Sequence, residues 1–349
     1  MPQIEQLLPG VPNIESPFFD ALFESTDAAT LKVARDLHVD GFAVIDFPEP
    51  EFEQLAQDVR ADLDPTFDWV FWREQGHAQG ISLRAQDAWR TNEAVKRIAC
   101  NTVLIDLLTR LYGKPAWPFQ TLNFPVGTQQ HIHTDSVHFS SVPERFMCGV
   151  WVALEDTDAD NGPLVYYPGS HRWPVYTNEH IGQCASLLPR PPTQALYEPL
   201  WRALVRAHGG QPRYFHARKG QALIWAANLL HGGARQNDAA RTRWSQVTHY
   251  FFGDCAYYTP MLSDPAYGRT DFRSLTNIAT GQSVPHMYAG HAVPQAYIDA
   301  SSGVTDWASL SSFDAKAYLA ANPDVAAAGV NAAEHYLLFG IKERRSLAP

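Results

Sequence analysis

The residues best suited to chemistry lie near the middle of the chain, in the stretch Gln-His-Ile-His-Thr-Asp at positions 130–135. In a β-strand, alternate side chains point to the same face of the sheet. If this stretch is a strand, His131, His133 and Asp135 lie side by side. Imidazole and carboxylate groups together suit a divalent metal ion, so the stretch predicts a metal site.

A third metal ligand must come from elsewhere in the chain, and His231 is the candidate. Two histidines and one carboxylate on one face of an iron ion, with the other positions open, are typical of non-heme Fe(II) oxygenases. His133 and Asp135 form a His-x-Asp pair, and His231 follows the largely apolar run 221–230 and precedes two glycines. The open positions of such a site admit a co-substrate and dioxygen.

Arg243 and Ser245 suggest what the co-substrate is. Strand alternation places the guanidinium and the hydroxyl on one face, and this pair fits a bound carboxylate. A metal next to a carboxylate anchor implies an acidic co-substrate that chelates the metal.

The elements that must position these residues change in character along the chain. From about residue 117, short strands separated by turn residues are typical of a sandwich or barrel. Strands are predicted at 119–124, 130–135, 146–154, 164–167, 222–225 and 244–252. Before them, helices are predicted at 27–38, 51–63 and 92–112, with one strand at 42–46. The long excursion 171–219, with a helix at 193–207, is interpreted as a lid because long loops in compact domains are usually functional.

Several motifs occur in an order that resembles the phytanoyl-CoA dioxygenase family of Fe(II)/2-oxoglutarate oxygenases, from about Leu37 to Phe252. The motifs are His133-x-Asp135, the Trp151 strand, Asn161-Gly-Pro-Leu164, Pro168-Gly-Ser-His171, Lys219-Gly220, His231-Gly232 and the Arg243 strand that ends His249-Tyr250. The interval from His231 to Arg243 is one residue longer than is usual in the family, which makes Arg241 a competing choice. Arg243 is preferred for its distance to His249-Tyr250, with the extra residue in the loop 236–240.

The resemblance implies a fold and a reaction. The fold is mainly β with flanking helices (α+β), a double-stranded β-helix or jelly roll. His133, Asp135 and His231 match the ligands of Fe(II), and Arg243 matches the arginine that pairs with the distal carboxylate of 2-oxoglutarate. The other residues expected at that co-substrate are Ser245, Trp151, Thr134 and Gln120. The implied reaction uses O2 to hydroxylate an unactivated C–H bond and releases succinate and CO2. The intact carboxylate of Asp135 disfavours the halogenase variants of this chemistry.

Other residues allow a functional and a structural interpretation. His131 has no family match as a ligand and is expected to line the pocket or support a ligand. His138 is expected on the surface or facing the substrate, and His249 as a packed strand residue. Trp69, Arg84 and Arg90 either line the substrate mouth or belong to the core.

Composition limits the partners and the location. The net charge is −10 and no basic run is present, which argues against nucleic acid and anionic membranes. The N-terminus lacks signal-peptide features and the longest apolar run is too short for a bilayer. We therefore expect a cytoplasmic protein with a small-molecule substrate. Its four cysteines form no CxxC pair and are interpreted as buried small residues.

The last part of the chain is expected to be a separate helical module. We expect an oxygenase domain at 1–300, comprising a helical part at 27–115 and a jelly-roll core at 117–255, followed by a module at 305–349. The module resembles one appended to bacterial surface and glycan-related proteins. Docking of a partner or homo-oligomerisation through it is a hypothesis. The alternative function for the whole chain is a non-catalytic jelly roll that binds a ligand or acts as a scaffold through this module.

Overall fold

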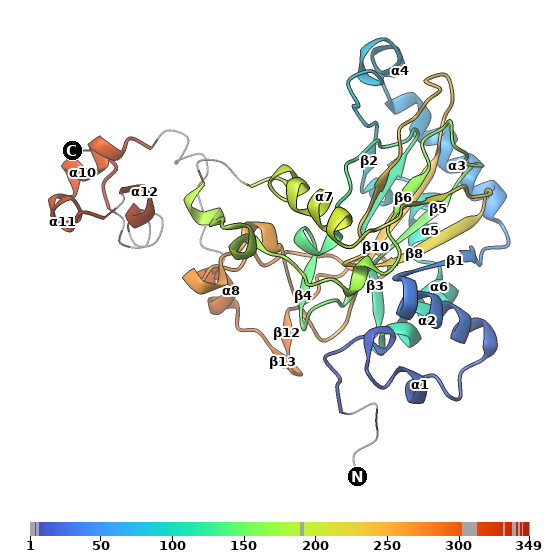
Figure 1. Cartoon of the computed structure of the whole chain (residues 1–349), viewed down its shortest axis with the longest axis horizontal. Helices are drawn as coiled ribbons and strands as arrows, with labels where there is room; N and C mark the ends of the chain where they lie inside the picture. The colour runs from blue at the N-terminus through green and yellow to red at the C-terminus, as the bar shows by residue number, and fades with distance from the viewer. Residues whose placement is uncertain are drawn as a thin grey trace.

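The computed structural model describes residues 4, 7–188, 192–301, 313–330, 332–336, 340, 343 and 345–348. A large and a small antiparallel sheet form the centre of this part of the chain, and helices cover the outer face of the large sheet (Figure 1). This arrangement agrees with the expected mainly β fold with flanking helices.

The large sheet has six strands in the order β1-β8-β5-β10-β3-β2. Their bounds are β1 Phe42–Asp46, β8 Gln221–Ala226, β5 Met147–Ala153, β10 Ser245–Phe252, β3 Ala116–Phe124 and β2 Ala85–Gln86. All neighbouring pairs in this sheet are antiparallel. The strands predicted at 42–46, 119–124, 146–154, 222–225 and 244–252 are therefore confirmed to within a few residues.

The small sheet has three strands in the order β7-β6-β9. Their bounds are β7 Arg213–Phe215, β6 Leu164–Tyr166 and β9 His231–Gly233. Only β6 was predicted, because β7 and β9 are too short to show an alternating pattern. The two sheets face each other across a shared core that includes Trp151 and Trp225 of the large sheet and Leu164 and Phe215 of the small one.

Alternation along β10 separates two environments. Arg243, just before the strand, and Val247 and His249 within it line the interior between the sheets. Trp244 instead packs in the core beneath the helices, and the Gln246 side chain donates a hydrogen bond to the Val95 carbonyl of α5. The interior face of this strand therefore supplies the wall of a cavity, and its other face holds the helices.

The helices α2, α3, α5 and α6 pack on the large sheet through one continuous core. Their bounds are α2 Ala28–Asp40, α3 Phe52–Leu63, α5 Glu93–Ala99 and α6 Thr102–Tyr112. The single helix predicted at 92–112 is divided because Asn101 caps α6, its side chain accepting a hydrogen bond from the Leu104 amide.

The stretch 130–135 is not a strand, and this expectation was wrong. Only His133 forms a bridge there, with His231, and Asp135 begins a short 3-10 helix, Asp135–Val137. The Nδ1 atom of His133 bonds the carbonyl oxygen of His131 within the same segment. The chain turns at this point, because local hydrogen bonds of this kind compete with the pairing of a regular β-strand.

The remaining elements surround the sheets or follow them. The predicted lid helix begins as the 3-10 turn Gln194–Leu196 and continues as α7, Glu198–Ala207. The other elements include α1 Phe19–Leu22, α4 Trp69–Phe71, α8 Gln295–Ser301, β4 Ser140–Val142, β11 Ala256–Tyr258, β12 Met287–Tyr288 and β13 His291–Ala292.

The C-terminal helices α10 Ala315–Ala321, α11 Pro323–Ala327 and α12 Ala332–His335 enclose a small core of their own. That core contains Tyr318, Val325, Ala332 and Tyr336. The predicted first helix of the module is divided at Pro323, which lacks the amide needed to continue a helix. The predicted boundary near 305 lies outside the described residues.

Candidate metal centre and co-substrate pocket

His133, Asp135 and His231 converge on one point inside the barrel. Each offers a ligand atom within 4.8 Å of the others. The His133 amide donates to the His231 carbonyl at 2.8 Å, and the His231 amide donates back at 2.9 Å. This bridge places the two imidazoles beside each other, with ring centroids 4.4 Å apart. Residues almost a hundred positions apart are thus held as one cluster.

Backbone carbonyls set the orientation of both imidazoles. The Nδ1 atom of His133 lies 2.9 Å from the His131 carbonyl oxygen, and that of His231 lies 2.9 Å from the Leu229 carbonyl oxygen. A carbonyl only accepts, so each Nδ1 carries the proton and each Nε2 keeps a free lone pair. Both Nε2 atoms are therefore prepared as metal ligands.

Asp135 is held as an anion among these rings. Burial alone would raise its pKa, but His231, His249, His133 and the Trp225 hydrogen bond outweigh it and lower the pKa to about 2. Trp225 donates from Nε1 to Asp135 Oδ2 at 2.7 Å. Burial lowers the pKa of His133 to about 3, so its imidazole stays neutral near pH 7. A neutral imidazole beside a carboxylate is the state that binds a metal ion.

Arg243 is completely buried, and most of its guanidinium has no partner. Its Nη2 donates to the Val126 carbonyl oxygen at 3.2 Å, while Nε and Nη1 make no hydrogen bond to any described residue. The guanidinium carbon lies 5.4 Å from the centre of the Trp151 ring. Burial lowers the pKa of Arg243 to about 10, so it stays charged near pH 7. Two unsatisfied donors on a buried cation favour an anionic ligand.

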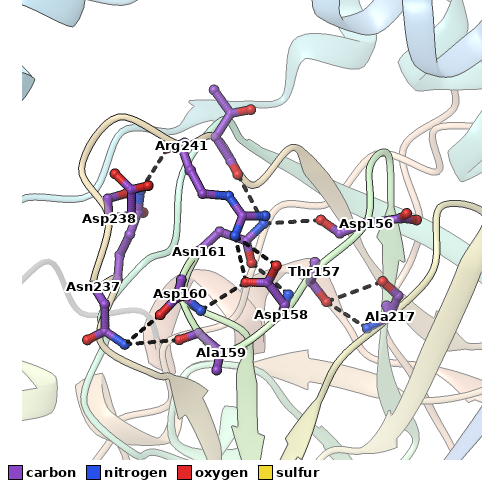
Figure 2. Close-up of polar contacts among 12 residues, drawn as sticks. Asp156, Thr157, Asp158, Ala159, Asp160, Asn161, Ala217, Asn237, Asp238 and Arg241 are labelled. Carbon is purple, nitrogen blue, oxygen red and sulfur yellow. Dashed lines mark hydrogen bonds and ion pairs between the residues drawn. The ribbon is translucent and has the colours of Figure 1, made fainter.

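Arg241 lies on the outside of the same loop. Its guanidinium donates to both carboxylate oxygens of Asp158, at 2.8 and 2.7 Å, and 37% of its side chain is exposed (Figure 2). The buried Asn161 holds this turn to the loop by donating to the carbonyl oxygens of Asp156 and Thr242. The geometry therefore favours Arg243 over Arg241 as the carboxylate anchor.

A cavity of about 350 Å³ connects the metal cluster with Arg243. The residues expected at the co-substrate or substrate that line it are Trp151, Gln120, His138 and Arg84. Ser245 is fully buried two residues after Arg243, and its hydroxyl makes no hydrogen bond within the described ranges. Trp151, Gln120, His138 and Arg84 therefore lie at this cavity, and their roles there stay a prediction.

Besides Ser245, four of the expected residues are not among those that line this cavity. Thr134 faces away from its neighbours His133 and Asp135 and lines a separate small cavity instead. His131 is largely exposed beside Glu198, because 130–135 is not a strand. Trp69 packs between Phe67 and Trp72, and Arg90 stacks on Trp89.

Sequence reasoning missed several residues that reach the site, among them Trp225, which bonds Asp135, and His249 and Gln194. His249 was interpreted as a packed strand residue, yet it lines the cavity, with Nε2 3.8 Å from Asp135 Oδ2 and Nδ1 2.9 Å from Gln120 Oε1. The alternation Arg243, Ser245, His249 along one strand face was a signal that could have found it. Gln194, in the segment that the sequence predicts to be a lid, also lines the cavity, and no sequence pattern indicated it.

The opposed antiparallel sheets, with a His-x-Asp pair and a distant histidine between them, define a double-stranded β-helix protein of the metal-binding kind. The chain belongs to the phytanoyl-CoA dioxygenase (PhyH) family, whose model matches residues 37–244. It is similar to the peroxisomal phytanoyl-CoA dioxygenase of Rattus norvegicus, at 26% identity over 132 residues, which is 37% of this chain and 36% of the rat protein. The chain thus matches little more than a third of that relative's length.

A solved structure shows the same fold. The non-heme alpha ketoglutarate dependent carbocyclase SnoK from nogalamycin biosynthesis matches with a TM-score of 0.51 and 16% identity, over 67% of this chain and 87% of SnoK. EctD from S. alaskensis matches with a TM-score of 0.48 and 18% identity, over 67% and 80% of the two chains. The family and the jelly-roll fold expected from the sequence are confirmed. None of the described helices is long and apolar enough to cross a bilayer.

Proposed function

We propose that this chain is an Fe(II)- and 2-oxoglutarate-dependent oxygenase that hydroxylates a small molecule. The observation that carries the proposal is that the cavity joins two complementary sites. At one end His133, Asp135 and His231 offer a facial set of ligand atoms, and at the other Arg243 presents unsatisfied donors. Membership of the family supports the same chemistry.

The ligand set fits Fe(II) on chemical grounds. Imidazole nitrogen and carboxylate oxygen are the donors of the two-histidine, one-carboxylate sites that leave positions open. Bound iron, together with 2-oxoglutarate and O2, would supply the oxidant for C–H hydroxylation, with release of succinate and CO2. The protein's part is to hold the imidazole lone pairs and the Asp135 charge in place before any ligand arrives.

Arg243 would bind the distal carboxylate of 2-oxoglutarate. Its donors belong to a charged group that is shielded from solvent, which makes a guanidinium–carboxylate pair strong and directional. The Trp151 ring packs over the guanidinium and prevents it from turning away. The unpartnered Ser245 hydroxyl offers one further donor to the same carboxylate.

Anaerobic addition of Fe(II) and then 2-oxoglutarate tests the proposal. We expect a weak visible charge-transfer band, and succinate release when O2 is admitted. His231→Ala should weaken iron binding by roughly 100-fold or more, because it removes one of three protein ligands. His131→Ala is the matched control and should bind iron as the wild type does. Absence of both the band and any turnover would instead favour a non-catalytic jelly roll.

The domain division is a second proposal, with the oxygenase domain at 1–300 and the module at 305–349. The separate core around Tyr318 and Val325 supports it. A chain that ends at residue 300 should keep its affinity for Fe(II) and 2-oxoglutarate. Loss of that affinity, or of folding, would show that the module is part of the oxygenase domain.

A further inference from the structure

The metal cavity continues outward into a second hollow of about 1070 Å³, which we call the vestibule. The two share five lining residues: Arg84, Phe124, Thr128, Gln130 and Gln194. The inner wall is taken up by the metal cluster and by Arg243. The vestibule is therefore the place from which a primary substrate reaches the metal.

The lining of the vestibule is polar almost throughout. Apart from Phe124, Ala78 and Gly80, the residues that line it carry hydrogen-bonding side chains: His77, Gln79, Ser82, Arg84, Thr128, Gln129, Gln130, His131, Gln194, Glu198 and Arg235. An alkyl chain laid against such a wall would leave donors and acceptors unpaired, at roughly 1–3 kcal/mol for each buried group. A hydrogen-bonding substrate would satisfy them.

The vestibule also carries uncompensated positive charge. Within the described ranges, neither Arg84 nor Arg235 lies within ion-pair distance of a carboxylate. The acidic residue of this lining, Glu198, is already engaged by Arg202 at 3.0 Å. Both residues are exposed, so a ligand that enters from solvent can reach their charge. They favour an anionic ligand.

Arg84 is the cation nearer to the metal cluster. It lines both the vestibule and the metal cavity, whereas Arg235 lines the vestibule alone. Arg84 directly precedes β2, which pairs with β3 through Ala85↔Asn123 and Gln86↔Leu122. Its backbone is therefore tied to the strand that carries Gln120 into the cavity.

Gln194, in the segment interpreted as a lid, is also held in place. Gln194 Oε1 accepts a hydrogen bond from Gln130 Nε2 at 3.4 Å and lies 3.2 Å from His138 Nε2. Near the base of the lid, Asp264 accepts hydrogen bonds from the amides of Ala185 and Ser186 at 3.0 and 2.7 Å. Gln130, Gln194 and Arg84 therefore all line the region that the two hollows share.

We propose that the primary substrate is a polar small molecule with a carboxylate or phosphate group, and that Arg84 binds this anion, with Arg235 at the outer end. Gln130 and Gln194 hydrogen-bond the neutral part of the molecule. Phe124 and Ala78 are the apolar side chains that line the vestibule, and they are too few to cover a long acyl chain, so the lining favours a polar substrate over a fatty acyl thioester. This inference rests on the proposed oxygenase function, because it assigns the reacting group to the same metal site.

The test uses matched probes that differ in charge. The full chain is loaded anaerobically with Fe(II) and 2-oxoglutarate, and each probe is titrated while the charge-transfer band is followed. The probes are N-acetylglucosamine with its 6-phosphate, glucose with glucuronate, and CoA with palmitoyl-CoA. The same probes are added to metal-free protein, where a rise in unfolding temperature reports binding. The variants are Arg84→Gln, Arg235→Gln and, as the matched control on the same segment, Arg90→Gln.

We expect the charged member of each sugar pair to give its half-maximal change in the band at a concentration roughly 10-fold or more below that of its neutral partner. The reason is that a charge-assisted hydrogen bond adds to its binding free energy. Arg84→Gln should abolish this advantage without changing the 2-oxoglutarate requirement, and Arg90→Gln should preserve it. Palmitoyl-CoA should bind no more tightly than CoA alone.

Three results would overturn the proposal. They are equal or absent responses to charged and neutral probes, a gain in affinity from the palmitoyl chain, and a raised 2-oxoglutarate requirement in Arg84→Gln. Absence of the band in the wild type would overturn the oxygenase function. The unfolding temperatures of the metal-free protein would still decide the charge preference, so the two failures are distinguishable.

Discussion

Trp225 donates a hydrogen bond of 2.7 Å from its indole nitrogen to Oδ2 of Asp135, the carboxylate of the candidate metal site. The indole comes from β8 and the carboxylate from the turn after His133. Such a bond fixes which carboxylate oxygen faces the metal, and partners of this kind commonly change metal affinity 10- to 100-fold, to order of magnitude. The large sheet would thus influence a bound metal through a side chain that is not a ligand.

Gly149→Ala should disturb this bond without touching a ligand. Gly149 lies opposite Trp225 in the register of β5 and β8, and a Cβ there would come within 2.1 Å of the indole ring. We expect the iron affinity to fall and the free energy of unfolding to drop by about 1–3 kcal/mol, as overpacking usually costs. Trp225→Phe is the companion variant and should weaken iron binding roughly 10-fold. Unchanged iron titrations in both variants would refute the role of the indole.

Arg243→Gln should raise the 2-oxoglutarate concentration for half-maximal charge-transfer absorbance by roughly 10- to 100-fold, because a charge-assisted pair is lost. Arg241→Gln removes a largely exposed ion pair with Asp158 and should change that concentration less than about twofold. The reverse order would move the anchor to Arg241 and place the extra residue of the loop elsewhere.

Gln236→Ala should weaken the binding of 2-oxoglutarate by Arg243 although Gln236 does not line the cavity. Gln236 is completely buried, accepts a hydrogen bond from the Gly127 amide at 2.9 Å, and donates to the carbonyl oxygens of Asp238 and Arg241 at 3.0 and 2.8 Å. It therefore ties the loop before Arg243 to the end of β3. We expect unfolding in urea to show a loss of about 1–3 kcal/mol.

In the same variant, the 2-oxoglutarate concentration that gives half-maximal charge-transfer absorbance should rise several-fold. Its neighbour Asn237 is exposed, and Asn237→Ala should stay within about 0.5 kcal/mol of the wild type. A Gln236→Ala variant that is destabilised but binds 2-oxoglutarate normally would show that the loop does not position Arg243.

His171 should make the protein sensitive to acid. Burial lowers the pKa of His171 to about 4, and the side chain is 2% exposed. In the unfolded chain a histidine takes up its proton near pH 6.5, to within about one unit. Between these two values the unfolded chain binds more protons, so the stability that is present above pH 6.5 is lost as the pH falls toward 4.

His171→Gln should make the free energy of unfolding depend less steeply on pH in that window, by up to about 1.4 kcal/mol per pH unit. Urea unfolding at a series of pH values measures this slope, and the comparison holds even if the variant is less stable overall. An unchanged slope would mean that His171 is protonated in the folded protein.

The sequence alone was sufficient for the family, for five of the six strands of the large sheet (all but β2) and for the cluster of His133, Asp135 and His231. These features depend on patterns that are local or keep a fixed order. A strand that contributes to a core shows alternation over five or more residues, as β5 and β10 do. A His-x-Asp pair is recognisable because its two ligands are close together along the chain.

Only the tertiary structure decided which of the nearby candidates face the cavity. Thr134 and His131 lie outside it because the chain turns at His133, and a turn breaks the alternation that would have placed them. His249 and Gln194 enter it because distant segments meet there. Arg243 and Arg241 carry the same group two residues apart, and burial separates their roles. One is enclosed with unpaired donors, and the other pairs with Asp158 in water, a difference that depends on packing and not on residue type.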